Sequence, residues 1–296
     1  MKLSINCLTI ALVTILSAAL VQGQNLFVSD SVSGTIYEFA PDGTRSTFAT
    51  GLGRPDGLAF NSAGNLFVAD AGGHGIYQFT PGGTRSDFAS VVNTPNGLAF
   101  NSAGDLFVTS EAGYGWASYV FEFTPAGEQS IVASWFNRPI GLAFNSAGNL
   151  FVADAGDCCV YYNIVQNGGN IFANALWGYG PSGLAFDKAG NLFVANSNIG
   201  NGTIYEFGPD GKRSTFATGL GRPDGLAFDS AGNLFVSDLS SGDIYEFTSN
   251  GTRTTFASGL NGPTFLAFQV PEPTTWSLLA LGALTLLGGC RMRRRN

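Results

Sequence analysis

Apolar and polar residues follow one pattern five times along the chain. The first copy is Gly57 to Asp70, read GLAFNSAGNLFVAD, and near copies begin at Gly97, Gly141, Gly183 and Gly225. In each copy a short apolar run, a small polar turn and a second apolar run predict one β-hairpin. Recurrence at a period of about 40 residues indicates a repeat architecture such as a propeller.

The second run of this hairpin begins with Asn-Leu-Phe-Val or Asp-Leu-Phe-Val. It starts at Asn25, Asn65, Asp105, Asn149, Asn191 and Asn233, with spacings of 40, 40, 44, 42 and 42 residues. Further strand-like segments follow it, such as Thr35–Phe39 and Arg45–Ala49, and Pro41-Asp42-Gly43 supplies the turn between these two. Each repeat therefore predicts a blade of four antiparallel strands.

The two ends of the repeat region are complementary. The first repeat lacks a Gly-Leu-Ala-Phe strand, whereas the chain finishes with an unattached one, Phe265–Phe268. Pairing this last strand with the strand at Asn25 completes the first blade and protects both terminal edges. We therefore predict an all-β, six-bladed β-propeller of four-stranded antiparallel blades over residues 24–269, closed by its C-terminal strand. An open solenoid is the alternative.

The N-terminus has the pattern of a secretory signal peptide over residues 1–23. Lys2 supplies the positive start, Cys7–Leu20 the apolar core, and Val21-Gln22-Gly23 a cleavage site with a small residue. The alternative, an uncleaved membrane anchor, is disfavoured because the apolar stretch is short for a spanning helix.

The C-terminus has three parts over residues 270–296. Val270-Pro271-Glu272-Pro273 precedes the apolar run Trp276–Gly289, and arginines follow at 291 and 293–295. This order resembles the PEP-CTERM sorting signal of Gram-negative bacteria, and the positive-inside rule would keep the arginines cytoplasmic. The resemblance implies an exosortase-like protease as partner, transient anchoring in the inner membrane and delivery to the cell surface or outside. A plain tail anchor is the alternative.

Charge excludes one class of partner. Five of the 14 basic residues and one of the 21 acidic residues lie in the two ends, which leaves nine basic and 20 acidic residues in the repeats. Because nucleic-acid binders need basic patches, we expect no nucleic-acid partner. Cations or neutral glycans are compatible with this balance, and contact with the membrane is expected only through the terminal segment.

The repeat pattern resembles the NHL-repeat and regucalcin/gluconolactonase-like propellers, in its Pro-x-Gly-Leu-Ala-Phe, Asn-Leu-Phe-Val-Ala-Asp and Ile-Tyr-Glu-Phe segments. In such enzymes, carboxylate and amide groups from several blades hold a divalent cation at the channel mouth. The matching positions, which follow the prolines of the inner strands, are Asp56, Asn96, Ile140, Ser182, Asp224 and Thr264.

Three of these positions carry suitable oxygen atoms. Asp56, Asn96 and Asp224 are therefore the candidate metal ligands, and oxygen ligands from different blades suit Ca²⁺. The family's ligand set is not evidently complete, because the other three positions supply no carboxylate and the family's glutamate has no clear match. The alternative is that Asp56, Asn96 and Asp224 only cap their own turns.

Other polar residues are interpreted as structural. Asp30, Asp70, Asp154 and Asp238 recur in most blades and are typical of turn formers. His74, the only histidine, is expected in a solvated loop, which leaves histidine-rich metal sites and a serine–histidine relay poorly supported. The adjacent cysteines at 158 and 159 could form a strained disulfide or remain thiols.

Aromatic residues break the symmetry of the repeats on one side of the ring. The irregular segments over the third and fourth repeats contain Tyr114, Trp116, Trp135, Trp177 and Tyr179, all expected on the variable face of the ring. Exposed rings offer flat surfaces for recognition, so we predict a ligand-binding surface here. Buried rings that fill gaps beneath irregular loops are the alternative.

These observations favour an exported binding module for a glycan, a protein or a matrix component. The alternative function is a metal-dependent hydrolase of the lactonase type, with a cation at the channel mouth. No catalytic residue is identified, because propellers host enzymes, binders and scaffolds alike.

Overall fold

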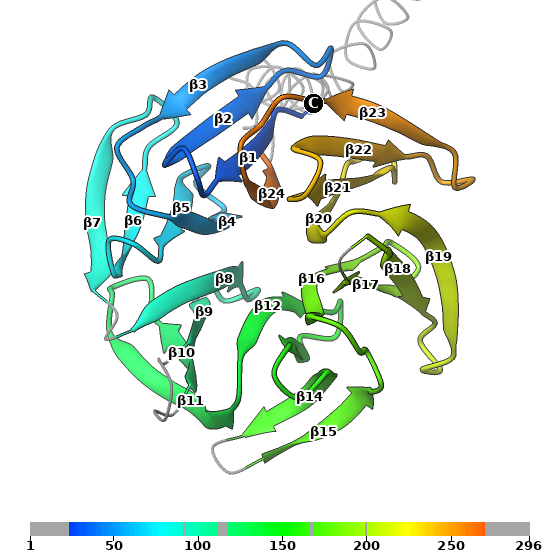
Figure 1. Cartoon of the computed structure of the whole chain (residues 1–296). Helices are drawn as coiled ribbons and strands as arrows, with labels where there is room; N and C mark the ends of the chain where they lie inside the picture. Colours follow the sequence, from blue (N-terminus) through cyan, green and yellow to red (C-terminus); the bar gives the residue numbers. More distant parts are fainter. Residues whose placement is uncertain (1–23, 91–92, 112–117, 166–167, 199, 270–296) are drawn as a thin grey trace, which may run out of the picture.

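The computed structural model describes residues 24–90, 93–111, 118–165, 168–198 and 200–269. Six four-stranded antiparallel sheets surround a central axis, as Figure 1 shows. The predicted six-bladed β-propeller is confirmed. The described residues contain no helix that is long and apolar enough to cross a membrane.

Each blade starts at the axis and continues outwards in chain order, apart from the blade that closes the ring. The innermost strands are β4 (Pro55–Phe60), β8 (Thr94–Phe100), β12 (Pro139–Phe144), β16 (Gly180–Phe186), β20 (Pro223–Phe228) and β24 (Pro263–Phe268). The second strands are β1 (Leu26–Asp30), β5 (Leu66–Asp70), β9 (Leu106–Glu111), β13 (Leu150–Asp154), β17 (Leu192–Ser197) and β21 (Leu234–Asp238). The second strands are almost entirely buried, since sheets pack on both of their faces.

The outer half of each blade meets solvent. The third strands are β2 (Thr35–Phe39), β6 (Gly75–Phe79), β10 (Ser118–Phe123), β14 (Cys159–Val165), β18 (Gly202–Phe207) and β22 (Asp243–Phe247). The outer strands are β3 (Arg45–Ala49), β7 (Arg85–Ser90), β11 (Gln129–Phe136), β15 (Gly168–Ala173), β19 (Arg213–Leu220) and β23 (Arg253–Ala257). Five of these six outer strands begin with an exposed polar residue, and the exception is β15, which begins with Gly168.

Every inner strand has a β-bulge beside its first proline. In β4, Pro55 pairs with Asp70 and Leu58 pairs with Val68, so two residues of β4 oppose one residue of β5. The same break in register occurs in β8, β12, β16, β20 and β24. A bulge turns the side chain at that point in a new direction. In this ring, the residue after each proline lines a cavity at one end of the central channel.

Phenylalanine pairs hold neighbouring blades together. A ring of each second strand packs edge-to-face on a ring of the next inner strand, an arrangement that aromatic quadrupoles favour. The pairs are Phe27–Phe60, Phe67–Phe100, Phe107–Phe144, Phe151–Phe186, Phe193–Phe228 and Phe235–Phe268, with centroids 5.0–5.1 Å apart. The six seams of the ring, where neighbouring blades meet, therefore have the same packing geometry.

The C-terminal strand closes the ring as predicted. β24 pairs with β1 in antiparallel register, with Leu26 opposite Phe268 and Val28 opposite Leu266. The backbone N–H of Gln269 also donates to the carbonyl of Asn25, at 2.9 Å. The first blade is thus built from both ends of the described chain.

Candidate functional site

The residues that follow the six inner-strand prolines share one cavity of about 290 Å³. The predicted cation ligands, Asp56, Asn96 and Asp224, are three of these six residues. The structure therefore brings them together at one end of the channel, which we call the mouth. Ser182 and Thr264 supply hydroxyl groups to the same lining.

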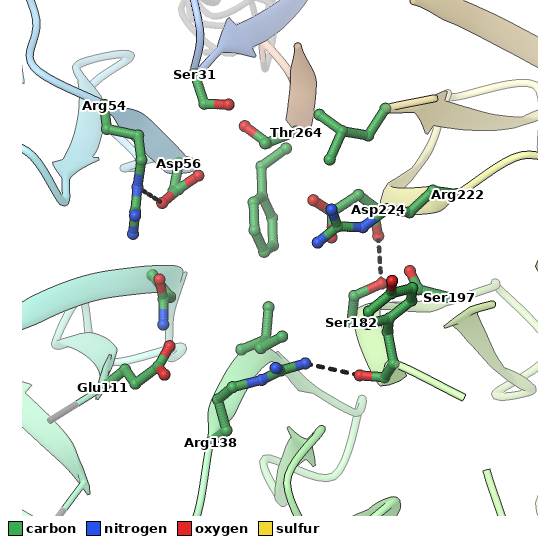
Figure 2. A pocket seen from close by; sticks show the side chains of 15 residues that line it. Ser31, Arg54, Asp56, Glu111, Arg138, Ser182, Ser197, Arg222, Asp224 and Thr264 are labelled. Atoms are coloured by element: carbon green, nitrogen blue, oxygen red, sulfur yellow. Dashed lines mark hydrogen bonds and ion pairs between the residues drawn. The ribbon is translucent and has the colours of Figure 1, made fainter. Parts of the chain in front are cut away.

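Three arginines also line the mouth, and the sequence analysis did not single them out. Arg54, Arg138 and Arg222 each precede the proline of an inner strand, in alternate blades. Figure 2 shows them around the cavity, with Arg54 beside Asp56 and Arg222 beside Asp224. The available signal was the Arg-Pro dipeptide, which recurs only in these three links of the variable face.

The recurrent aspartates at the ends of the second strands hold these arginines in place. Each carboxylate accepts the backbone N–H of the arginine and that of the residue before it. The arginine N to carboxylate O distances are 2.7 Å for Arg54 to Asp70, 2.9 Å for Arg138 to Asp154 and 2.8 Å for Arg222 to Asp238. Asp30 holds Asn261 in the same way at 2.8 Å. The structural role predicted for these aspartates is confirmed.

The two acidic side chains that follow inner-strand prolines have perturbed acidities. Burial raises the pKa of Asp56 to about 7, although its ion pair with Arg54, at 3.3 Å, opposes this shift. Burial also raises the pKa of Asp224, and the charge of Arg222 is the largest opposing cause. Both carboxyl groups are therefore easier to protonate than a carboxyl group in water.

Tyr179 lies between two of the arginines. The Arg138 Nη2 donates to the Tyr179 carbonyl at 2.7 Å, and the Arg222 Cζ lies 5.4 Å from the centre of the Tyr179 ring. Within the described structure, the buried Nε of Arg138 and that of Arg222 have no hydrogen-bond partner. Tyr179 is 41% exposed and lines the cavity, and Trp177, two residues earlier, is 72% exposed.

Trp135, another of the predicted aromatic residues, lies away from the mouth. Trp135, on β11, stacks on Phe136 with ring centroids 4.1 Å apart and meets Tyr161 edge-on at 4.8 Å. Its ring is a packing element of the outer strands and is not among the residues that line the mouth. Tyr114 and Trp116 lie outside the described residues, so the predicted aromatic surface is represented here by Trp177 and Tyr179.

The donor groups at the mouth fit a cation only in part. Among the described residues, no cluster of three or more His, Cys, Asp or Glu side chains could hold a metal ion. Asp56 already binds Arg54, and the Asn96 amide nitrogen donates to the Pro139 carbonyl at 3.3 Å. A cation here would have Asp56, Asp224 and the Asn96 oxygen as its candidate ligands, and three guanidinium groups as neighbours.

The remaining reactive side chains lie away from the mouth. His74 is exposed in the loop between β5 and β6, as predicted. Cys158 and Cys159 are free cysteines, which selects the thiol alternative. Burial raises the pKa of the Cys159 thiol, and the neighbouring Asp157 charge raises it further.

Comparisons with known families support the resemblance seen in the sequence. Residues 21–112 match the SMP-30/gluconolactonase/LRE-like region, and residues 136–160 match the NHL repeat. Residues 269–295 match the PEP-CTERM protein-sorting motif. The chain thus combines a gluconolactonase-like, NHL-type propeller with a PEP-CTERM sorting motif. A search of curated proteins found no match to this sequence.

Similar solved structures include a chain of a protein complex and enzymes. A nidogen/laminin complex contains a chain with a TM-score of 0.71 at 17% identity, covering 84% of this chain and 99% of that one. A gluconolactonase from Xanthomonas campestris gives 0.65 at 20% identity, covering 72% and 79%. A virginiamycin B lyase from Staphylococcus aureus gives 0.59 at 15% identity, covering 84% and 94%. At such identities the likeness establishes the fold alone.

Proposed function

We propose that this protein is an exported binding module whose ligand, a glycan, lies at the mouth of the propeller. The observation that carries the proposal is the group formed by Arg138, Tyr179 and Arg222 at the mouth. The exposed Trp177 lies two residues before Tyr179 in the chain. A half-open cavity with aromatic rings and a few converging polar groups is the usual form of a ligand site.

The chemistry of this group suits carbohydrate better than a flat protein partner. Aromatic rings provide planes on which the CH faces of sugars rest, and guanidinium groups donate several hydrogen bonds in a fixed fork. The cavity of about 290 Å³ is near the lower end of ligand pockets, roughly 300–1,000 Å³. A single terminal sugar is therefore the size of ligand that we expect inside it.

A glycan array tests this function. Wild-type protein should bind a limited set of glycans, and Tyr179→Ala and Trp177→Ala should each weaken that binding by about tenfold or more, as for an aromatic anchor at the centre of an interface. Ile171→Ala is the matched control, because Ile171 is also exposed but lies on outer strand β15. Absence of glycan binding in the wild type, or unchanged binding in both aromatic variants, would contradict the proposal.

We also infer that the PEP-CTERM motif delivers the protein to an exosortase-like protease and then to the cell surface or the medium. A signal peptide over residues 1–23 would start this route, and the segment within 276–289 would hold the chain in the inner membrane until cleavage. Fractionation of cells that express wild-type protein or a Pro271→Ala, Glu272→Ala double variant tests this route. The variant should accumulate in the inner membrane, and wild-type localisation of the variant would refute the inference.

The second candidate function is a lactonase-type hydrolase with Ca²⁺ or another divalent cation at the mouth. It is favoured by the shared position of Asp56, Asn96 and Asp224 and by the gluconolactonase-like match. Calcium should then raise the melting temperature by mass action, and Asp224→Ala should abolish the rise. If calorimetry detects no heat of binding at millimolar calcium, the lactonase-type function is contradicted.

A further inference from the structure

We propose that the glycan bound at the mouth is acidic, and that Arg138 and Arg222 hold its carboxylate while Tyr179 supports the sugar ring. This inference rests on the proposed binding function and adds the chemical class of the ligand. It follows from how the two arginines are held and from what they leave unsatisfied.

The two guanidinium groups converge on one residue from different blades. Arg138 belongs to the link before β12 and Arg222 to the link before β20, yet both contact Tyr179, which precedes the intervening β16. Their backbones are fixed by the carboxylates of Asp154 and Asp238. A pair of guanidinium groups held in this way is preorganised, so little side-chain entropy is lost when an anion binds.

Arg138 and Arg222 have more N–H donors than the surrounding residues have acceptors for them. A guanidinium has five N–H donors, and the Nε groups of both arginines are buried without a partner in the described structure. Leaving a buried donor without a hydrogen-bond partner is unfavourable. A planar carboxylate accepts two parallel hydrogen bonds from such a fork, which is the strongest common pairing for arginine.

The local charge of the mouth differs from that of the whole repeat region. Nine basic and 20 acidic residues are spread over the ring, but three of the nine basic residues meet at this one cavity. Glu111, Asp56 and Asp224 are the acidic residues of the lining. Burial raises the pKa of Asp56 to about 7, which weakens its negative charge near neutral pH, and burial also raises the pKa of Asp224. Distant acidic residues contribute little, because the screening length is about 8 Å at physiological salt.

The aromatic residues select a sugar acid over a small free anion. Tyr179 is partly exposed beside both guanidinium groups, and Trp177 is more exposed. An anion bound by charge alone would gain nothing from these rings, whereas the apolar face of a uronic acid can rest on them. A sugar phosphate shares the oxyanion chemistry, so the test must separate it from a uronate.

The test is titration calorimetry of the full chain, purified in detergent, with a matched pair of probes. Oligogalacturonate carries the carboxylates, and its methyl-esterified form has the same sugars without the charge. Glucose 6-phosphate is the third probe. We expect the acid form to bind at least about tenfold more tightly than the ester and the phosphate, and to lose about tenfold or more in Arg138→Gln and in Arg222→Gln.

Arg85→Gln is the matched control variant, because Arg85 also lies over a tyrosine ring, Tyr77 at 3.6 Å, but is on outer strand β7. It should bind the acid form as the wild type does. Circular dichroism of each variant identifies any loss of folding, and Arg222→Lys, which keeps the charge but not the fork, should recover only part of the affinity.

The outcomes separate this inference from the proposed function. Equal binding of the acid and the ester, or unchanged binding in both glutamine variants, overturns the acidic class but leaves a neutral glycan site that depends on Tyr179. Tightest binding of glucose 6-phosphate assigns the arginines to a phosphate and also overturns the uronate. Absence of binding by any of the three probes overturns the inference, and the glycan array then decides the proposed function.

Discussion

Asp56 is a residue at the mouth whose charge depends strongly on its surroundings. It is buried, its carboxylate meets Arg54 at 3.3 Å, and its pKa is raised from 3.8 to about 7. Burial is the largest cause, and the charge of Asp224 adds to it. The ion pair with Arg54 does not restore the ordinary pKa. The free-energy cost of removing the Asp56 carboxylate from water is larger than the attraction to one half-exposed guanidinium group.

Replacing Asp56 by asparagine tests this balance. The folded protein keeps the Asp56 proton between about pH 4 and 7, where the unfolded chain has lost it, so the stability that Asp56 contributes is greatest at low pH and falls as pH rises through this window. Asp56→Asn cannot ionise. Its free energy of unfolding relative to the wild type should therefore increase from pH 4 to pH 8, by an amount on the order of 1–4 kcal/mol.

Denaturant unfolding at a series of pH values measures this difference. Asp42→Asn is the control, because Asp42 is exposed in the turn after β2 and its pKa is lowered by hydrogen bonds to Thr44. The control should show no gain in stability at high pH. A pH-independent difference between Asp56→Asn and the wild type would show that Asp56 has an ordinary acidity.

At the scale of the element, β24 decides whether the ring closes. It supplies the inner strand of the first blade, and Phe268 packs on Phe235 of the last blade with centroids 5.0 Å apart. This seam has the same geometry as the other five, although it joins residues from opposite ends of the described chain. Without β24, the edge of β1 would have no partner on its inner side.

Ending the chain at Gly262 should therefore cause aggregation or a large loss of stability. Ending it at Gln269 is the control, because this variant keeps β24 and lacks only residues 270–296. Phe268→Ala should cost about 3–5 kcal/mol, and Phe60→Ala should cost a similar amount at an ordinary seam. The free energies of unfolding and the melting temperatures check this, and a soluble Gly262 truncation with wild-type melting would refute the role of β24.

At the scale of the whole molecule, the mouth and the ends of the propeller lie on opposite faces. Thr264, at the start of β24, lines the mouth, whereas the N–H of Gln269, after its last residue, bonds to Asn25. The Gln24 side chain also donates to the Gln269 carbonyl at 3.2 Å. The predicted signal peptide and the predicted C-terminal membrane segment are therefore attached to the face opposite the mouth.

This arrangement predicts that the mouth points away from the bilayer while the chain is anchored through the segment within 276–289. A fluorophore placed at Ser230, which shares a surface pocket with Gln24, should be quenched strongly by a lipid-attached quencher. A fluorophore at position 177, near the mouth, should be quenched weakly. The measurement uses single-cysteine variants in proteoliposomes, with the four native cysteines replaced by serine. Stronger quenching at position 177 would contradict this orientation.

The strands, their order and the closed ring could be predicted from the sequence, because they follow from local chemistry that recurs around the ring. Asn61, for example, accepts hydrogen bonds from the backbone N–H groups of Ala63 and Asn65, and Gly64 has a φ of 77°. The Asn-Ser-Ala-Gly turn therefore forms wherever these four residues recur. Alternation of apolar residues then assigns the buried faces. The pairing of the last strand followed from counting strand types.

The contents of the mouth could not be predicted from the sequence, because contacts between distant residues determine them. Arg54 is placed by Asp70, 16 residues later in the chain, and Gly57 lies so close to the next blade that a Cβ atom there would collide with the Asn96 carbonyl oxygen. Similarly, the sequence could not separate Trp135, which packs among outer strands, from the exposed Trp177. Hydrophobic periodicity reports which face of a strand is buried, but bulges and contacts between blades determine where a side chain at the end of a strand points.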